Sequence, residues 1–172
     1  MNELTKYKIR TLSSLDQSFL WEMLYQSLYI PEGSVSLERE IINQPDISKY
    51  VIEWGKEDDF GFVAVDESDH PVGAIWLRLL KGEERGYGYV DDKTPEMGMA
   101  VLAEHRNKGI GTMLLSHLLE SPNHIYEYIS LSVASENPAL HLYQRFGFEV
   151  VREYGDSIVM KRKLNEKKQV AI

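Results

Sequence analysis

Apolar positions along this chain recur with two different spacings, and each spacing predicts a different element. In 15–29 the apolar residues return at intervals typical of one face of a helix. In 60–65 and 72–79 they form nearly continuous runs on either side of a turn at 66–71, which predicts two strands paired as a hairpin. The same reasoning predicts further elements in the order strand 7–10, strand 128–134, helix 139–146, and a last hairpin of 149–154 with 158–163.

Two stretches break these patterns. Residues 36–56 have helical spacing but contain Pro45, which is costly inside a helix, so we predict two short helices separated at that point. Residues 81–95 hold three glycines, two tyrosines and four acids without a helical stripe. That composition predicts a surface loop between the first hairpin and the strand that follows it.

The segment 96–111, Glu-Met-Gly-Met-Ala-Val-Leu-Ala-Glu-His-Arg-Asn-Lys-Gly-Ile-Gly, has the strongest chemical signature, because a strand pattern leads through a polar, glycine-containing turn into a helix. The first N–H groups of a helix lack intrahelical acceptors and carry the positive end of its dipole, so they stabilise an anion. Gly109 and Gly111 let the backbone approach that anion closely. Arg106 and Lys108 add positive charge at the rim. The segment therefore predicts a phosphate-binding turn.

Two common phosphate-binding motifs do not fit this turn. A P-loop has a lysine directly after its second glycine, yet Thr112 follows Gly111, and Arg106 stands where the first glycine would be. A dinucleotide-binding fingerprint has a third glycine and lies near the first strand of a βαβ repeat. Here a single glycine pair lies past the middle of the chain. The pattern that remains is Arg-x-x-Gly-x-Gly.

This pattern resembles the signature of the GNAT superfamily of N-acetyltransferases, Arg/Gln-x-x-Gly-x-Gly/Ala, between the fourth strand and the following helix. The residues that match it in full are Arg106, Gly109 and Gly111. A second block, 131–150, is similar to the family's run Asn-x-x-Ala-x-x-Leu-Tyr-x-x-x-Gly-Phe, with Ala139 one place early. The Leu-Tyr-x-x-x-Gly-Phe part is intact over 142–148.

The resemblance covers about the C-terminal half of the chain and implies an α/β fold, with a mixed, mostly antiparallel sheet of six to seven strands flanked by about four helices. It also implies an acetyl-CoA-dependent N-acetyltransferase, in which a primary amine attacks the thioester directly in a ternary complex. Acetyl-CoA is then the co-substrate. The residues implied to bind it are Met99, Ala100, Val101, Arg106, Asn107, Lys108, Gly109, Ile110, Gly111, Thr112, Asn137 and Tyr143.

Two side chains are implied as catalytic. Glu96 opens the central strand where relatives carry a general base, and the alternative is a strand-end carboxylate that faces solvent or pairs with a lysine. Tyr143 stands where relatives place a general acid near the thioester sulfur, because a phenol with an ordinary pKa near ~10 is protonated at neutral pH. The alternative is an aromatic residue on a half-buried helix face. Asn137 hydrogen-bonds the pantetheine arm, caps the following helix, or does both.

Aromatic residues in the first helix raise a choice between core and acceptor pocket. Trp21, Tyr25 and Tyr29 are spaced to share one helix face, and relatives use this region to bind the amine. His105 borders the phosphate-binding turn, where it either touches phosphate or faces solvent. The five histidines show no metal-ligand spacing and the chain has no cysteine, so no metal is predicted.

Composition narrows the class of protein. The 172 residues predict one domain over 1–164 with a C-terminal tail at 165–172. No apolar run approaches the ~20 residues of a membrane span, and the N-terminus lacks the apolar centre of a signal peptide, so we expect a cytoplasmic protein without a membrane partner. A net charge of −8 argues against nucleic-acid binding, which needs clustered positive charge.

The predicted acceptor is a small-molecule or peptide amine, and a polyamine, an antibiotic or a protein N-terminus all remain open. A homodimer is compatible with the resemblance. The alternative function is a non-catalytic acyl-CoA-binding regulatory module of the same fold, which burial of Glu96 and Tyr143 away from the thioester would favour. A longer acyl chain would require a deeper slot than the sequence reveals.

Overall fold

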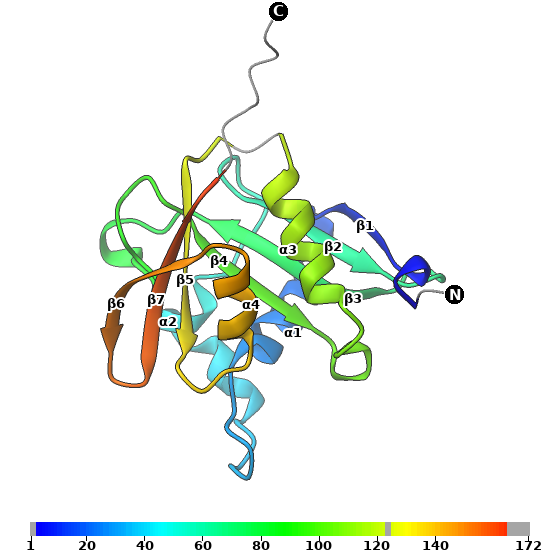
Figure 1. Cartoon of the computed structure of the whole chain (residues 1–172), viewed down its shortest axis with the longest axis horizontal. Helices are drawn as coiled ribbons and strands as arrows, with labels where there is room; N and C mark the ends of the chain where they lie inside the picture. Colours follow the sequence, from blue (N-terminus) through cyan, green and yellow to red (C-terminus); the bar gives the residue numbers. More distant parts are fainter. Residues whose placement is uncertain (1–2, 123–124, 165–172) are drawn as a thin grey trace, which may run out of the picture.

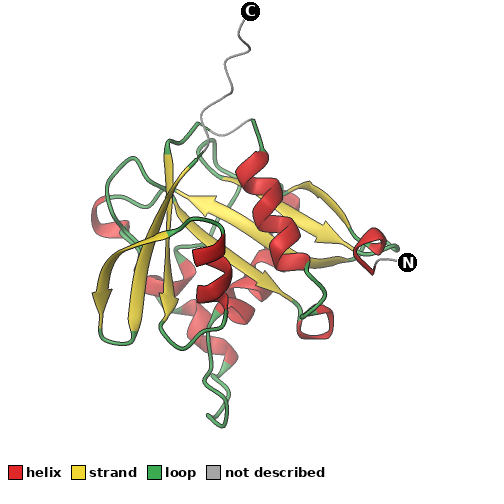
Figure 2. Ribbon diagram, in the orientation of Figure 1, coloured by secondary structure: helices red, strands yellow, loops and turns green. Residues whose placement is uncertain are grey.

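The computed structural model describes residues 3–122 and 125–164, which form one seven-stranded sheet between two layers of helices (Figure 1, Figure 2). The strands lie in the spatial order β1, β2, β3, β4, β5, β7, β6. All neighbours are antiparallel except β4 and β5, which are parallel. Their bounds are β1 (Lys8–Thr11), β2 (Phe60–Val65), β3 (Pro71–Arg78), β4 (Glu96–Val101), β5 (Tyr128–Ala134), β6 (Glu149–Tyr154) and β7 (Ser157–Lys163). This architecture confirms the predicted fold class. The predicted tail at 165–172 lies outside the described residues.

Helices cover both faces of the sheet. On one face lie α1 (Gln17–Ser27) and α2 (Pro45–Ser48), and on the other lie α3 (Ile110–Glu120) and α4 (Ala139–Arg145). Side chains of β2 are buried on both faces of the sheet: Phe62 packs on the α3 side, and its neighbour Val63 packs on the α1 side. Successive strand residues point to opposite faces, so a strand covered on both sides is apolar throughout. The two nearly continuous apolar runs are therefore the paired strands β2 and β3, as predicted.

The segment 36–56 divides where its proline predicts. The 3₁₀ turn η3 (Arg39–Asn43) ends just before α2, and Pro45 occupies the first position of α2, where its missing N–H costs no hydrogen bond. The predicted helix 15–29 is shortened at both ends. The 3₁₀ turn η2 (Ser14–Asp16) takes up the first residues, where the Asp16 carboxylate accepts a hydrogen bond from the Ser13 N–H at 2.9 Å, and α1 itself ends at Ser27.

The parallel strands β4 and β5 separate soon after they meet. Glu96 and Ser130 are their one pair of aligned residues, and the Ser130 N–H donates to the Pro95 carbonyl at 3.0 Å. On its other edge β4 is paired along its whole length with β3. The centre of the sheet therefore opens on the β5 side of β4, beyond Glu96.

The segment 81–95 differs from the predicted surface loop. Its first part, including the 3₁₀ turn η4 (Gly82–Glu84), is exposed, but Gly88, Thr94 and Pro95 are buried. The reason is a set of hydrogen bonds from the loop backbone to the Glu96 carboxylate, which a pattern of residue types does not show. No helix among the described residues is long and apolar enough to cross a membrane.

Candidate active site

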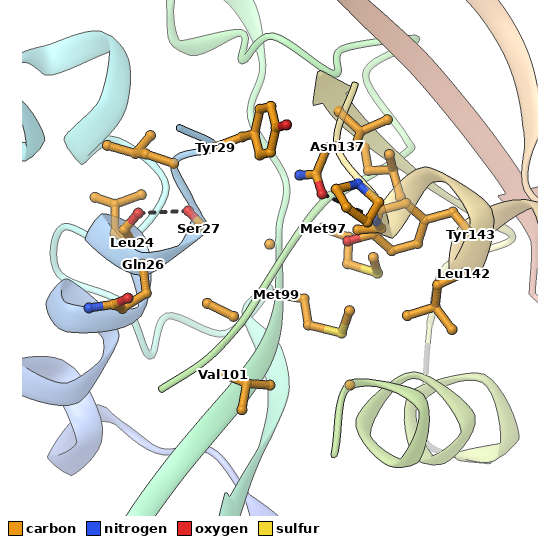
Figure 3. A pocket seen from close by; sticks show the side chains of 18 of the residues that line it. Leu24, Gln26, Ser27, Tyr29, Met97, Met99, Val101, Asn137, Leu142 and Tyr143 are labelled. Atoms are coloured by element: carbon orange, nitrogen blue, oxygen red, sulfur yellow. Dashed lines mark hydrogen bonds between the residues drawn. The ribbon is translucent and has the colours of Figure 1, made fainter. Parts of the chain in front are cut away.

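A cleft of about 770 Å³ lies where β4 and β5 separate. The end of α1 and the segment after it form one wall, and the start of α4 with the loop before it forms the opposite wall (Figure 3). Met99 lies between these walls on β4. Of the residues predicted for cofactor binding and catalysis, all border this cleft except Lys108. The fold thus brings together residues from both halves of the sequence.

The phosphate-binding turn leads directly into α3. Gly109 caps the helix in the left-handed region, with φ of 86°, and Asn107 has φ of 61°. These two left-handed residues turn the chain so that the start of α3 faces the cleft. Ile110, Gly111 and Thr112 border the cleft there. Their N–H groups precede the first intrahelical bond, from the Met113 N–H to the Gly109 carbonyl at 3.0 Å. An anion in this part of the cleft would meet these donors.

The two basic residues of the turn are placed differently. Arg106 Nε donates to the Val101 carbonyl at 3.0 Å, and its Nη2 donates to Gln26 Oε1 on α1 at 2.9 Å. Arg106 therefore links the end of β4 to α1 while it borders the cleft. Lys108 is half-buried and does not border the cleft. Backbone N–H groups, rather than a lysine, are the donors that the turn aims at the cleft.

The backbone of β4 supplies donors at the open edge. The Leu102 N–H donates to the Val72 carbonyl of β3 at 2.8 Å, and backbone direction alternates along a strand. The N–H and carbonyl groups of Ala100 therefore also face β3, while those of Met99 and Val101 face the gap. The Val101 carbonyl accepts the hydrogen bond from Arg106 Nε described above. Of the three β4 residues implied to bind acetyl-CoA, Met99 and Val101 therefore direct N–H groups into the gap, and Ala100 borders the cleft without doing so.

Glu96 is buried, with 2% of its surface exposed. Its Oε1 accepts hydrogen bonds from the Tyr50 hydroxyl at 2.9 Å and the Gly88 N–H at 2.7 Å, and its Oε2 accepts one from the Gly86 N–H at 2.9 Å. Burial raises the pKa of Glu96, and the hydrogen bonds offset part of that rise. The carboxylate therefore neither faces solvent nor bonds a lysine. A raised pKa brings it closer to the value that suits a general base.

Sequence reasoning missed the residues that hold Glu96. A Cβ on Gly86 would lie 2.2 Å from the Tyr50 hydroxyl and 2.3 Å from Glu96 Oε1, so any side chain here would displace these two groups. Tyr50 comes from the segment after α2, far from Glu96 in sequence, and no local pattern links them. The available signal was the Gly-Tyr-Gly run at 86–88 just before the central strand.

Tyr143 lies on α4 with its ring in the core, 5.6 Å from the Phe148 ring, and only 7% of its surface is exposed. Burial raises its pKa to about 12. Among the residues described, none hydrogen-bonds its hydroxyl, and the side chain reaches the cleft from the α4 wall (Figure 3). The ring is therefore a core residue, as one interpretation of Tyr143 predicts, and the general-acid role of its hydroxyl stays a prediction.

Asn137 hydrogen-bonds the start of the following helix, and its contact with the pantetheine arm stays a prediction. Its Oδ1 accepts a hydrogen bond from the Ala139 N–H at 2.9 Å, at the start of α4. Its amide nitrogen points into the cleft on the side of Tyr29 (Figure 3). The oxygen is therefore used by the helix, and the nitrogen remains available to a carbonyl of a bound molecule.

The aromatic residues of α1 and of the segment just after it divide between core and cleft. Trp21 packs in the core, whereas Tyr25 and Tyr29 border the cleft. The Tyr29 hydroxyl donates to the Glu136 carbonyl at 3.2 Å, which joins the two walls. His105 is half-buried at the cleft, and its Nδ1 lies 2.8 Å from the Tyr7 hydroxyl. In 3–122 and 125–164, no three acids or histidines are grouped as metal ligands.

A family model described as "Acetyltransferase (GNAT) family" matches residues 21–148, which contain the cleft. The chain belongs to this acetyltransferase family. The match includes both blocks that resemble it, the phosphate-binding turn and the 142–148 segment. Within this GNAT domain, the first block builds the start of α3 and the second supplies Tyr143.

Two curated relatives carry names of the same chemical class. N-alpha-acetyltransferase 50 of Danio rerio is 31% identical over 90 residues, which are 49% of this chain and 48% of that protein. An N-alpha-acetyltransferase of Sulfurisphaera tokodaii is 30% identical over 112 residues, which are 60% of this chain and 65% of that protein. The chain thus spans about half to two thirds of the length of these relatives.

A solved structure extends the comparison to the whole fold. The protein yncA of Salmonella typhimurium, solved with its cofactor acetyl-CoA, matches with a TM-score of 0.62 at 17% identity. The match covers 95% of this chain and 96% of that one. At this identity the likeness shows that the GNAT fold is shared.

Proposed function

We propose that the protein is an N-acetyltransferase that moves an acetyl group from acetyl-CoA to a primary amine, by direct attack within a ternary complex. One observation carries the proposal. A buried carboxylate, Glu96, and a buried tyrosine hydroxyl, that of Tyr143, border the same cleft, and the unpaired backbone edge of β4 runs through it. These are the base, the acid and the amide donors that acyl transfer from a thioester to an amine requires.

The cleft fits acetyl-CoA on the evidence of its own donors. The start of α3, turned toward the cleft at Gly109, suits the pyrophosphate, and the gap between β4 and β5 suits an extended arm that pairs with a strand edge. The amide nitrogen of Asn137 is a further donor to that arm. When bound, acetyl-CoA supplies the acetyl group as a reactive thioester.

Glu96 receives the proton of the amine. An amine is mostly charged at neutral pH and must lose a proton before it attacks. The carboxylate takes that proton directly or through a water, and its raised pKa makes this transfer easier. Met99 and Val101 direct N–H groups at the gap, where they stabilise the negative charge that develops on the carbonyl oxygen.

Tyr143 completes the exchange. As the new carbon–nitrogen bond forms and the carbon–sulfur bond breaks, the Tyr143 hydroxyl gives its proton to the departing sulfur. The acylated nitrogen then loses its second proton to solvent, and a proton from solvent restores the hydroxyl. Its pKa of about 12 keeps the hydroxyl protonated at neutral pH. Both groups border the cleft, which supports catalysis over the alternative of a non-catalytic acyl-CoA-binding module.

For the acceptor, we favour the α-amine of a peptide over a free small amine. Both curated relatives described above are named N-alpha-acetyltransferases. Residues 24–30 and Tyr87 also border the cleft, and we infer that a peptide lies along them. The net charge of −8 adds a weak attraction for any cationic amine. A cytoplasmic location and a homodimer stay predictions.

The test is release of free thiol from acetyl-CoA with a panel of acceptors. We expect acetyl-CoA to bind in calorimetry and thiol to appear only with an amine. Peptides with a free N-terminus should react faster than the same peptides with a blocked N-terminus and a free lysine, and faster than spermidine. Binding without thiol release on the whole panel would favour the non-catalytic module, and a faster reaction with spermidine would replace the peptide acceptor.

A further inference from the structure

The Glu96 carboxylate is held by three donors that no motif of the family signature contains. A carboxylate offers about four acceptor positions. Tyr50 and Gly88 occupy Oε1, and Gly86 occupies one position on Oε2. The open position is therefore on Oε2, and the amine would meet that oxygen.

Tyr50 has a second contact that links the carboxylate to the glycine loop. Its hydroxyl donates to Glu96 Oε1 and accepts the Tyr87 N–H at 2.8 Å. The Tyr50 carbonyl in turn accepts the Trp76 Nε1–H at 3.2 Å, which fixes the tyrosine backbone to β3. The Tyr50 hydroxyl thus bonds both Glu96 and the glycine loop, while the Tyr50 backbone is bonded to β3.

Other charged groups around Glu96 are engaged elsewhere. They come from the segment before Tyr50, from β3 and from the segment before the glycine loop, and they are Lys49, Asp46, Arg78 and Arg85. Lys49 donates to the Arg85 carbonyl at 2.6 Å, and Arg78 pairs with Asp59 at 2.8 Å. Across the sheet, β5 presents the uncharged Ser130. Tyr50 is thus the side chain that hydrogen-bonds Glu96 within the described residues.

We propose that Tyr50 is a positioning residue for the acetyl transfer: its hydroxyl fixes Glu96 Oε1, leaves Oε2 to the amine, and keeps the buried carboxylate ionised. The kinetic part of this assignment rests on the proposed function. The electrostatic part does not, because it concerns the ionisation of Glu96 in the free protein. A hydrogen bond to the charged form of an acid lowers its pKa, so loss of the Tyr50 donor must raise the pKa of Glu96.

The first experiment measures the pKa of Glu96 by NMR titration of protein labelled with ¹³C at the glutamate carboxyl carbons. The Glu96→Gln variant identifies the signal. In Tyr50→Phe we expect the pKa of Glu96 to rise by about one unit. The control is Tyr126→Phe, which removes another buried tyrosine hydroxyl, one that donates to the Asp58 carbonyl at 2.7 Å. It should leave the pKa of Glu96 unchanged.

A second variant keeps the test decisive if Tyr50→Phe does not fold. Incorporation of 3,5-difluorotyrosine in place of Tyr50 preserves the ring and makes its hydroxyl a stronger donor. The pKa of Glu96 should then move down. An unchanged pKa of Glu96 in both position-50 variants, or an equal shift in Tyr126→Phe, would overturn the proposal.

The kinetic experiment measures kcat/KM as a function of pH and follows its fall at low pH, the acid limb of the profile. A base acts in its deprotonated form, so activity is lost as pH falls through its pKa. Tyr50→Phe should move this limb to higher pH and lower kcat/KM about tenfold at pH values below the limb of the unaltered protein, while Tyr126→Phe leaves the limb in place. A limb that stays fixed would overturn the positioning role. If the unaltered protein releases no thiol with any amine, the proposed function fails, and the NMR result still decides whether Tyr50 controls the ionisation of Glu96.

Discussion

The two glycines of the phosphate-binding turn are predicted to respond differently to alanine. Gly109 has φ of 86°, in the left-handed region that side chains disfavour. Gly111 has no positive φ, and a Cβ there would lie 3.6 Å from Met99 and 3.9 Å from Leu142, which are ordinary contacts. Alanine at Gly109 must therefore hold a strained backbone, whereas alanine at Gly111 fits the helix.

The magnitude follows from the conformation. The left-handed region costs an L-residue ~1–2 kcal/mol. If Gly109→Ala keeps the turn, this cost appears as lower stability, which is a drop in Tm of about 2–8 °C for a chain of this size. If the turn relaxes instead, binding must restore it, and the Kd for coenzyme A rises about 5–30-fold. The loss in free energy of unfolding and the loss in free energy of coenzyme A binding should together equal ~1–2 kcal/mol. Gly111→Ala should change stability by less than ~1 kcal/mol, in the favourable direction.

The assay pairs thermal unfolding with calorimetric titration of coenzyme A on the same three proteins: unaltered, Gly109→Ala and Gly111→Ala. The geometry of the turn predicts a lower Tm or a higher Kd for Gly109→Ala, and near-normal values of both for Gly111→Ala. Equal losses in both variants would mean that the turn tolerates no side chain anywhere, and normal values for Gly109→Ala would mean that its left-handed backbone does not aim the start of α3.

Three further predictions concern single side chains. Tyr143→Phe should lower kcat about 100-fold and leave the Kd of acetyl-CoA within threefold, because it removes a proton donor and little volume; equal losses in both quantities, by stopped-flow and calorimetry, would contradict the acid role. Glu96→Gln should lower kcat/KM at least about 100-fold and abolish its acid limb, and a limb that persists in the variant would assign the base elsewhere. Asp16→Asn should destabilise the fold by ~1–2 kcal/mol, because Asp16 accepts hydrogen bonds from Arg10 and from the Ser13 N–H. The Arg10 hydrogen bond lowers the pKa of Asp16 below 3.8, so this difference should hold above pH 3.8 and shrink as pH falls below it, as urea unfolding would show.

Elements defined by neighbouring residues could be predicted from the sequence. The β2 and β3 hairpin and the start of α3 depend on apolar runs, turn residues and glycines that lie close together in the chain. Pro45 indicated the helix break for the same reason. In these segments the local preference and the tertiary fold agree, and the pattern was sufficient.

The environment of the candidate base could not be predicted in this way. Glu96 is held by Tyr50 and by Gly86, which come from separate segments and meet only in the folded chain. The same applies to Arg106, whose guanidinium turns back to Gln26 on α1. Residue type and spacing identified the groups that carry the chemistry, but the partners that fix their orientation follow from tertiary contacts.

The most direct test of the account is to follow the acetyl group itself. Protein would be mixed with acetyl-CoA labelled with ¹³C in the acetyl group and with a peptide that has a free N-terminus, and both protein and peptide would be examined by mass spectrometry within a single turnover. Direct transfer predicts label on the peptide α-nitrogen, none on the protein, and loss of the reaction in Glu96→Gln. Label that accumulates on the protein, or that appears as free acetate without acetylated peptide, would contradict transfer within a ternary complex.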